Sequence, residues 1–119
     1  MSELIKVLVT GGAGFIGSAL CRHLHSKGNF HIVILDKLTY ASNLNSIKNI
    51  INDDIVTFIK GSIGDKKLIK EIFDKYSPRF IFNLAAETHV DNSIENPEIF
   101  VKTNIIETFS LLEESLKYY

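Results

Sequence analysis

The sequence is poor in several residue types, and each shortage excludes a class of protein. Its 119 residues include one cysteine, two prolines and no tryptophan. Cys21 has no second cysteine to pair with, so an internal disulfide is excluded and a reducing cytoplasm is the expected location. The first residues, MSELIKVLV, lack the charged and then apolar pattern of a secretion signal.

The balance of charge and the length of the apolar runs exclude two kinds of partner. The 13 lysines and arginines nearly balance the 14 aspartates and glutamates, and the sequence has no basic run that would neutralise a row of phosphates. We therefore expect no nucleic acid partner. Apolar runs such as residues 80–82 and 84–86 are far too short to cross a bilayer, so no membrane partner is expected either.

What the sequence does contain is a regular alternation of strand and helix patterns. Apolar runs rich in β-branched residues predict strands at residues 5–10, 31–35, 55–60 and 79–84. Apolar residues at helical spacing predict helices at residues 15–27 and 43–51, a third that Asp65 caps and that stops before Pro78, and a last one that begins at Pro97. Because no repeat or linker interrupts this alternation, residues 1–119 are predicted to form one α/β domain with a doubly wound, Rossmann-like parallel sheet of four strands.

The segment TGGAGFIG, residues 10–17, joins the first predicted strand to the first predicted helix. Its spacing is Gly-x-x-Gly-x-x-Gly, in which Gly11 permits a tight turn, Gly14 lets a ligand approach and Gly17 lets the helix pack closely on the strand. At such a place, backbone N–H groups and the positive end of the helix dipole would stabilise a pyrophosphate. The alternative is that the three glycines only close a turn.

Asp36 ends the second predicted strand, 19 positions after Gly17. A carboxylate at this position would accept hydrogen bonds from both ribose hydroxyls of a dinucleotide and would repel a 2′-phosphate. NAD is therefore the expected cofactor rather than NADP, although Lys37 would tolerate such a phosphate. The alternative is that Asp36 caps a turn.

Two further segments carry a family resemblance, DKLTYASNLNSI at residues 36–47 and AAETHVDNSIENPEIFVKTNI at residues 85–105. Together with the glycine segment, they resemble the extended short-chain dehydrogenase/reductase family, and within it the nucleotide-sugar 4,6-dehydratases. The match spans nearly the whole chain but only roughly the first third of such an enzyme. In that family NAD takes a hydride from sugar C4, water is lost across C5 and C6, and the hydride returns to C6. The resemblance thus implies the cofactor-binding part of a lyase.

The resemblance also implies three groups of cofactor contacts. Against the pyrophosphate would lie Phe15 and Ile16. Around the adenosine ribose and the adenine would lie Asp36, Lys37, Leu38, Thr39 and Ile63. Under or near the nicotinamide ribose would lie Leu84, Ala85, Ala86, Thr88 and Thr103, and Thr88 would also meet the substrate sugar.

This chain departs from the family pattern at two positions. Ser62 stands where the family generally has an aspartate, directly before the adenine-contacting Ile63, so the acceptor for the adenine amino group is weakened. Asn92 stands where relatives commonly have an arginine, which removes a positive group from the region where a nucleotide-sugar would dock.

The family's catalytic chemistry needs a tyrosine and a lysine four positions apart, and these 119 residues contain no such pair. We therefore expect no catalytic residue in them and no dehydratase turnover from them. Two alternatives stay open: the cofactor half of a UDP-sugar epimerase or dehydratase, and a non-catalytic dinucleotide-binding or assembly remnant.

Three remaining features have simpler interpretations. His89 and Asp91 are predicted to belong to a polar loop rather than a metal site, and no metal is expected. The apolar seam of the last helix is predicted to be core packing, and its residues are Val101, Ile105, Phe109, Leu112 and Leu116. The strand at residues 79–84 is predicted to leave one edge unpaired, which favours self-association through that edge or through the last helix.

Overall fold

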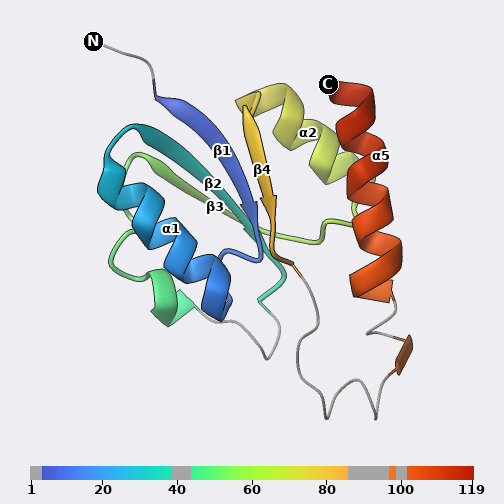
Figure 1. Cartoon of the computed structure of the whole chain (residues 1–119), viewed down its shortest axis with the longest axis horizontal. Helices are drawn as coiled ribbons and strands as arrows, with labels where there is room; N and C mark the ends of the chain where they lie inside the picture. Colours follow the sequence, from blue (N-terminus) through green and yellow to red (C-terminus); the bar gives the residue numbers. More distant parts are fainter. Residues whose placement is uncertain (1–3, 39–43, 86–96, 99–101) are drawn as a thin grey trace.

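The computed structural model describes residues 4–38, 44–85, 97–98 and 102–119. Its strands are β1 (Ile5–Thr10), β2 (Phe30–Asp36), β3 (Val56–Lys60) and β4 (Phe80–Asn83). They form one sheet in the order β3-β2-β1-β4, and every neighbouring pair is parallel (Figure 1). The helical elements are α1 (Phe15–Lys27), the 3₁₀ helix η1 (Leu44–Ile47), α2 (Lys66–Tyr76), the π-helical segment η2 (Lys102–Glu107) and α5 (Thr108–Tyr118). The predicted doubly wound parallel sheet is confirmed.

The sheet is buried on both faces because side chains alternate along its strands. In β1, Val7 and Val9 belong to the core beneath α1 and η1, whereas Leu8 belongs to the core beneath α2 and α5. Figure 1 shows α1 on one face of the sheet and both α2 and α5 on the other. Two helix layers around one parallel sheet place the carboxyl ends of the strands at a common edge, which is where open α/β sheets bind ligands.

The start and stop signals of two helices act as the sequence predicts. Helix α1 begins at Phe15 and ends before Gly28, whose φ of 79° is the left-handed value typical of a helix end. Helix α2 is capped by Asp65, whose side chain accepts a hydrogen bond from the Leu68 N–H at 3.1 Å. It ends at Tyr76, and its C-cap residue, Ser77, directly precedes Pro78.

Cys21 lies inside α1 and is fully buried between the helix and the sheet. Burial raises the pKa of its thiol to about 12, since the thiolate would lose its hydration.

The helix predicted over residues 43–51 is wrong in length and type. Only Leu44–Ile47 are helical, as one 3₁₀ turn, and turns follow. Asn45, Ser46 and Asn49 explain the difference, since their side chains compete for backbone hydrogen bonds and disfavour a helix interior. The apolar residues still reach the core, because Ile47 and Ile50 are buried against the α1 side.

The prediction that the seam of the last helix is core packing is also wrong. Four of its five residues are largely exposed, namely Ile105, Phe109, Leu112 and Leu116, and Val101 lies outside the described residues. The buried side of α5 instead presents Ser110 and Leu111, and Tyr118 packs on Phe73 of α2 with 4.8 Å between ring centroids. Both sides of the helix carry apolar residues, so periodicity alone does not say which side faces the sheet.

Strand β4 occupies one edge of the sheet, as the sequence predicts. Its large side chains are only partly covered, with exposed fractions of 50% for Phe80 and 37% for Phe82. Within the part of the chain that the structure describes, no helix combines the length and apolar character that a membrane span requires.

Candidate functional site

The glycine segment forms a tight turn between β1 and α1. Gly11 has a φ of 71°, and a Cβ atom there would lie 2.6 Å from the backbone carbonyl of Leu84. A Cβ atom on Gly17 would lie 2.0 Å from the carbonyl oxygen of Gly11. Real Cβ atoms do not approach so closely, so any side chain at these positions would push the turn away from β4 or from α1.

The amino end of α1 is open. Its N-cap residue, Gly14, offers no side chain to cap the helix, and the first turn contains no acidic residue. The side chains of Phe15 and Ile16 in that turn are 90% and 68% exposed. The N–H groups of the first turn and the positive end of the helix dipole are therefore available to an anion such as a pyrophosphate.

Asp36 is buried at the carboxyl end of β2 and is bonded to the glycine turn. Its Oδ2 accepts a hydrogen bond from the Ala13 N–H at 3.0 Å, and its Oδ1 accepts one from the Leu38 N–H at 2.7 Å. Leu38 adopts a φ of 59°, which closes this turn. The turn-capping alternative is therefore realised, and it is compatible with ribose binding because a carboxylate has about four lone-pair sites.

Thr10 ties the end of β4 to the end of β1. Its hydroxyl donates to Asn83 Oδ1 and accepts hydrogen bonds from the Leu84 N–H at 3.1 Å and the Ala85 N–H at 3.3 Å. Leu84 and Ala85 are thus held beside Gly11. Thr10 was not among the predicted site residues; its position as the last residue of a buried strand was the available signal.

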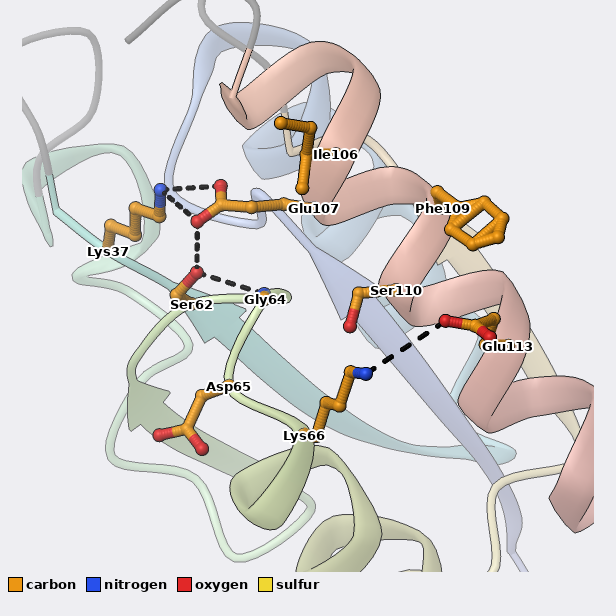
Figure 2. Close-up of a pocket in the computed structure, with 10 residues that line it drawn as sticks. All are labelled: Lys37, Ser62, Gly64, Asp65, Lys66, Ile106, Glu107, Phe109, Ser110 and Glu113. Atoms are coloured by element: carbon orange, nitrogen blue, oxygen red, sulfur yellow. Dashed lines mark hydrogen bonds and ion pairs between the residues drawn. The ribbon is translucent and has the colours of Figure 1, made fainter.

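A second polar cluster joins the ends of β2 and β3 to the start of α5. Glu107 has a side chain only 6% exposed, and its Oε1 and Oε2 lie 2.9 Å and 2.7 Å from Lys37 Nζ. Ser62 Oγ donates to Glu107 Oε1 at 2.7 Å and accepts from the Gly64 N–H at 3.0 Å. Figure 2 shows these side chains converging on the Glu107 carboxylate. The sequence analysis missed Glu107, although it is an isolated acid within the apolar run IIETF.

A cavity of about 580 Å³ adjoins this cluster (Figure 2). It lies between the segment that follows β3 and helix α5, and its walls include Ser62, Asp65, Phe109 and Ser110. The hydroxyl oxygen of Ser110 is the one buried side-chain oxygen or nitrogen among the described residues that lacks a hydrogen-bond partner within the protein. Polar groups and two apolar side chains, those of Ile106 and Phe109, therefore line a space beside the end of β2.

The structure thus brings most of the sequence-predicted cofactor residues to the carboxyl edge of the sheet. Near the glycine turn lie Gly11, Gly14, Phe15, Ile16, Gly17, Leu84 and Ala85. At the ends of β2 and β3 lie Asp36, Lys37, Leu38, Ser62 and Ile63, of which Ile63 is buried in the core beneath α2. Outside the described residues lie Thr39, Ala86, Thr88, His89, Asp91 and Asn92. Thr103 belongs to the backbone of η2. Among the residues that are described, no group of three or more metal-ligating side chains occurs.

Comparison with known proteins shows which family this chain is similar to. The sequence model of the family described as GDP-mannose 4,6 dehydratase matches residues 8–118. A dTDP-glucose 4,6-dehydratase of Escherichia coli is 48% identical over 115 residues, which are 97% of this chain and 32% of that protein.

Two solved structures are similar over 96% of the chain. The dTDP-glucose 4,6-dehydratase of Streptomyces venezuelae, crystallised with NAD bound, has a TM-score of 0.89 at 34% identity, and 36% of its chain is covered. The UDP-glucose 4-epimerase of Thermotoga maritima, crystallised with UDP-glucose, has a TM-score of 0.83 at 35% identity, with 35% of its chain covered. This chain therefore spans about a third of the length of these relatives. With its glycine turn, its acidic β2 end and these matches, the chain belongs to the GDP-mannose 4,6 dehydratase family and resembles the N-terminal part of the dTDP-glucose 4,6-dehydratases.

Proposed function

We propose that these residues bind NAD as the cofactor-binding part of a nucleotide-sugar 4,6-dehydratase. The observation that carries the proposal is the open amino end of α1 next to a buried carboxylate at the end of β2. The Asp36 carboxylate is bonded directly to the Ala13 N–H of the glycine turn, so the anion site and the ribose site have a fixed relative position.

Each part of the dinucleotide has a place at the carboxyl edge. The pyrophosphate lies at the first turn of α1, where Gly14 leaves the N–H groups uncovered. The adenosine ribose hydroxyls bond to the Asp36 carboxylate. The nicotinamide end runs toward Leu84 and Ala85, which Thr10 holds in place. When bound, NAD supplies a reversible hydride acceptor, and the residues described here bind and orient it.

The whole enzyme that we propose is a lyase that converts dTDP-glucose to dTDP-4-keto-6-deoxyglucose and water, in a cytoplasmic setting. The family match and the 48% identity with a dTDP-glucose 4,6-dehydratase support this substrate. The second candidate, the cofactor half of a UDP-sugar epimerase, is supported by a TM-score of 0.83 with such an enzyme. Similarity of fold does not separate the two, because they share the dinucleotide-binding layers and differ in the substrate site.

Two experiments test the proposal. Calorimetry of the purified chain with NAD should give saturable binding, and no heat at millimolar NAD would favour a non-catalytic assembly remnant that binds no dinucleotide. Incubation with dTDP-glucose and NAD should give no 4-keto product from these 119 residues, because they contain no tyrosine followed four positions later by lysine. Turnover would contradict the proposal that the catalytic residues of the dehydratase reaction lie outside these 119 residues.

We also propose that the chain self-associates through one apolar flank. The flank consists of the side chains of Ile105, Phe109, Leu112 and Leu116, all of them exposed. An exposed apolar helix face favours association because it gains from being covered. The outer edge of β4, which carries the exposed Phe80 and Phe82 on the opposite face of the sheet, is a second candidate surface.

A further inference from the structure

We propose that Glu107 makes this site selective against a 2′-phosphate by holding Lys37 in an ion pair. The inference rests on the proposed binding of NAD, and it concerns which of the two nicotinamide dinucleotides the site accepts. Glu107 acts through Lys37 and is therefore a positioning residue.

Lys37 is the cation that would otherwise favour NADP. It follows Asp36 directly, and Asp36 stands where the adenosine ribose presents its 2′-hydroxyl in dinucleotide-binding sheets. A basic side chain at this place is the usual means of accommodating a 2′-phosphate. Here both oxygens of Glu107 contact the Lys37 ammonium, at 2.9 Å and 2.7 Å, so binding a phosphate would require this pair to break.

Glu107 is held in a fixed position, which makes the pair costly to break. Its carboxylate is buried, and Oε1 also accepts a hydrogen bond from Ser62 Oγ at 2.7 Å. Gly64 provides the space, because a Cβ atom there would lie 2.7 Å from Glu107 Cγ. Removing Lys37 from the pair would leave a buried carboxylate without its counter-charge, which proteins strongly disfavour.

The local charge supports the same conclusion. Asp36 and Glu107 contribute two negative charges and Lys37 one positive charge, so the three together carry a net charge of −1. A 2′-phosphate would bring nearly two more negative charges into a partly buried site, where they are poorly screened. Glu107→Gln removes one negative charge without changing the size of the side chain, and it removes the ion pair that holds Lys37.

The test is the ratio of NAD to NADP affinity, measured by calorimetry for the wild type and four variants. In the wild type NAD should bind more tightly. Glu107→Gln should shift the ratio toward NADP by at least about tenfold, which corresponds to about 1.4 kcal/mol. Glu107→Asp keeps the charge and should retain the preference for NAD. In the double variant Glu107→Gln with Lys37→Met, the gain in NADP affinity should disappear, since the gain depends on the lysine.

A matched control comes from α5, the helix that directly follows Glu107. Glu113 pairs with Lys66 at 4.0 Å on the surface, and Glu113→Gln makes the same change in net charge. It should leave the NAD to NADP ratio within about twofold of the wild type, because exposed charges are screened. An equal shift in both glutamine variants would show a general charge effect and would overturn the proposal.

Three further results would overturn it. An unchanged ratio in folded Glu107→Gln would show that Glu107 has no part in selectivity, while the proposed NAD binding would stand. Persistence of the NADP gain after Lys37→Met would show that Glu107 does not act through Lys37. If the wild type binds neither dinucleotide, the proposed function fails, and this inference fails with it.

The double variant Glu107→Gln with Lys37→Met keeps the proposal testable if Glu107→Gln alone does not fold, because it removes both charges of the pair and leaves the net charge of the cluster unchanged. Since the wild-type lysine is engaged by Glu107, NADP should bind the double variant as weakly as it binds the wild type, within about threefold. A tenfold or larger loss of NADP affinity would mean that Lys37 already contacts the phosphate in the wild type, which contradicts the proposal.

Discussion

Two regions of this molecule differ in how far the side chains at their surface are engaged by other residues of the chain. At the carboxyl edge of the sheet, polar side chains contact one another across the ends of different strands: Thr10 bonds to the end of β4, Asp36 to the glycine turn and Glu107 to Lys37. On the flank, large apolar side chains such as Phe109 and Leu116 stand 57% and 82% exposed. The first region is preorganised by this chain's own residues, whereas the second resembles half of an interface.

The largest expected effect comes from breaking the turn at the organised edge. Gly17→Ala places a Cβ atom 2.0 Å from the Gly11 carbonyl oxygen, so α1 and the turn must separate. We expect NAD binding to be lost and the free energy of unfolding to fall by about 3 kcal/mol. Urea denaturation and calorimetry measure the two effects.

Gly28→Ala is the matched control for that change. Gly28 directly follows the helix that contains Gly17, but a Cβ atom there would meet nothing within 4 Å. Its positive φ still makes the substitution cost about 1 kcal/mol, while NAD binding should persist. Equal effects of the two alanines on NAD binding would show that the close approach at Gly17 is unimportant.

Removal of the Asp36 carboxylate tests the link between the turn and β2. Asp36→Ala leaves the Ala13 N–H without this buried acceptor, which should cost about 2 kcal/mol of stability. NAD affinity should fall at least about tenfold, since the ribose loses its acceptor as well. Asp54→Ala, at an exposed aspartate, should leave both quantities unchanged. If Asp36→Ala kept the full NAD affinity, this would show that the ribose does not bind at Asp36.

Positive charges introduced on the flank should weaken self-association and leave NAD binding at the carboxyl edge unchanged. The double variant Phe109→Lys with Leu112→Lys adds two positive charges to the exposed face of α5 and should shift sedimentation toward a smaller species. NAD affinity should change by less than about twofold. The double variant Glu71→Gln with Asp74→Asn changes the net charge equally on the exposed face of α2 and should leave sedimentation unaltered. A strictly monomeric wild type at high concentration would contradict self-association.

The smallest expected effect lies at a helix end outside both regions. Ser77 adopts a φ of 48° after α2, a conformation that glycine reaches without steric cost. Ser77→Gly should therefore stabilise the fold by about 0.5 kcal/mol, whereas Ser26→Gly within α1 should destabilise it by about 0.5–1 kcal/mol. Thermal unfolding distinguishes the two signs, and NAD binding should not respond to either change.

The contrast between the regions also explains what the sequence could predict. Strand β1, helix α1 and the turn between them follow from signals within a few residues, such as an apolar run, three spaced glycines and a left-handed stop at Gly28. Glu107 was missed because its partners, Lys37 and Ser62, are 70 and 45 positions away in the chain. The buried side of α5 was misjudged for the same reason, since burial depends on what lies opposite a helix and not on its own sequence.

The buried thiol of Cys21 offers a way to measure how often α1 separates from the sheet. Because its pKa is raised to about 12, the thiol stays protonated at neutral pH. The contribution of this buried, protonated thiol to the free energy of unfolding is complete below the ordinary thiol pKa and declines as the pH rises toward 12. A thiol reagent at pH 8 can therefore react only when α1 lifts from the sheet, so the labelling rate reports how often that opening occurs. A dinucleotide bound at the first turn of the same helix should lower the labelling rate of Cys21 in proportion to its occupancy.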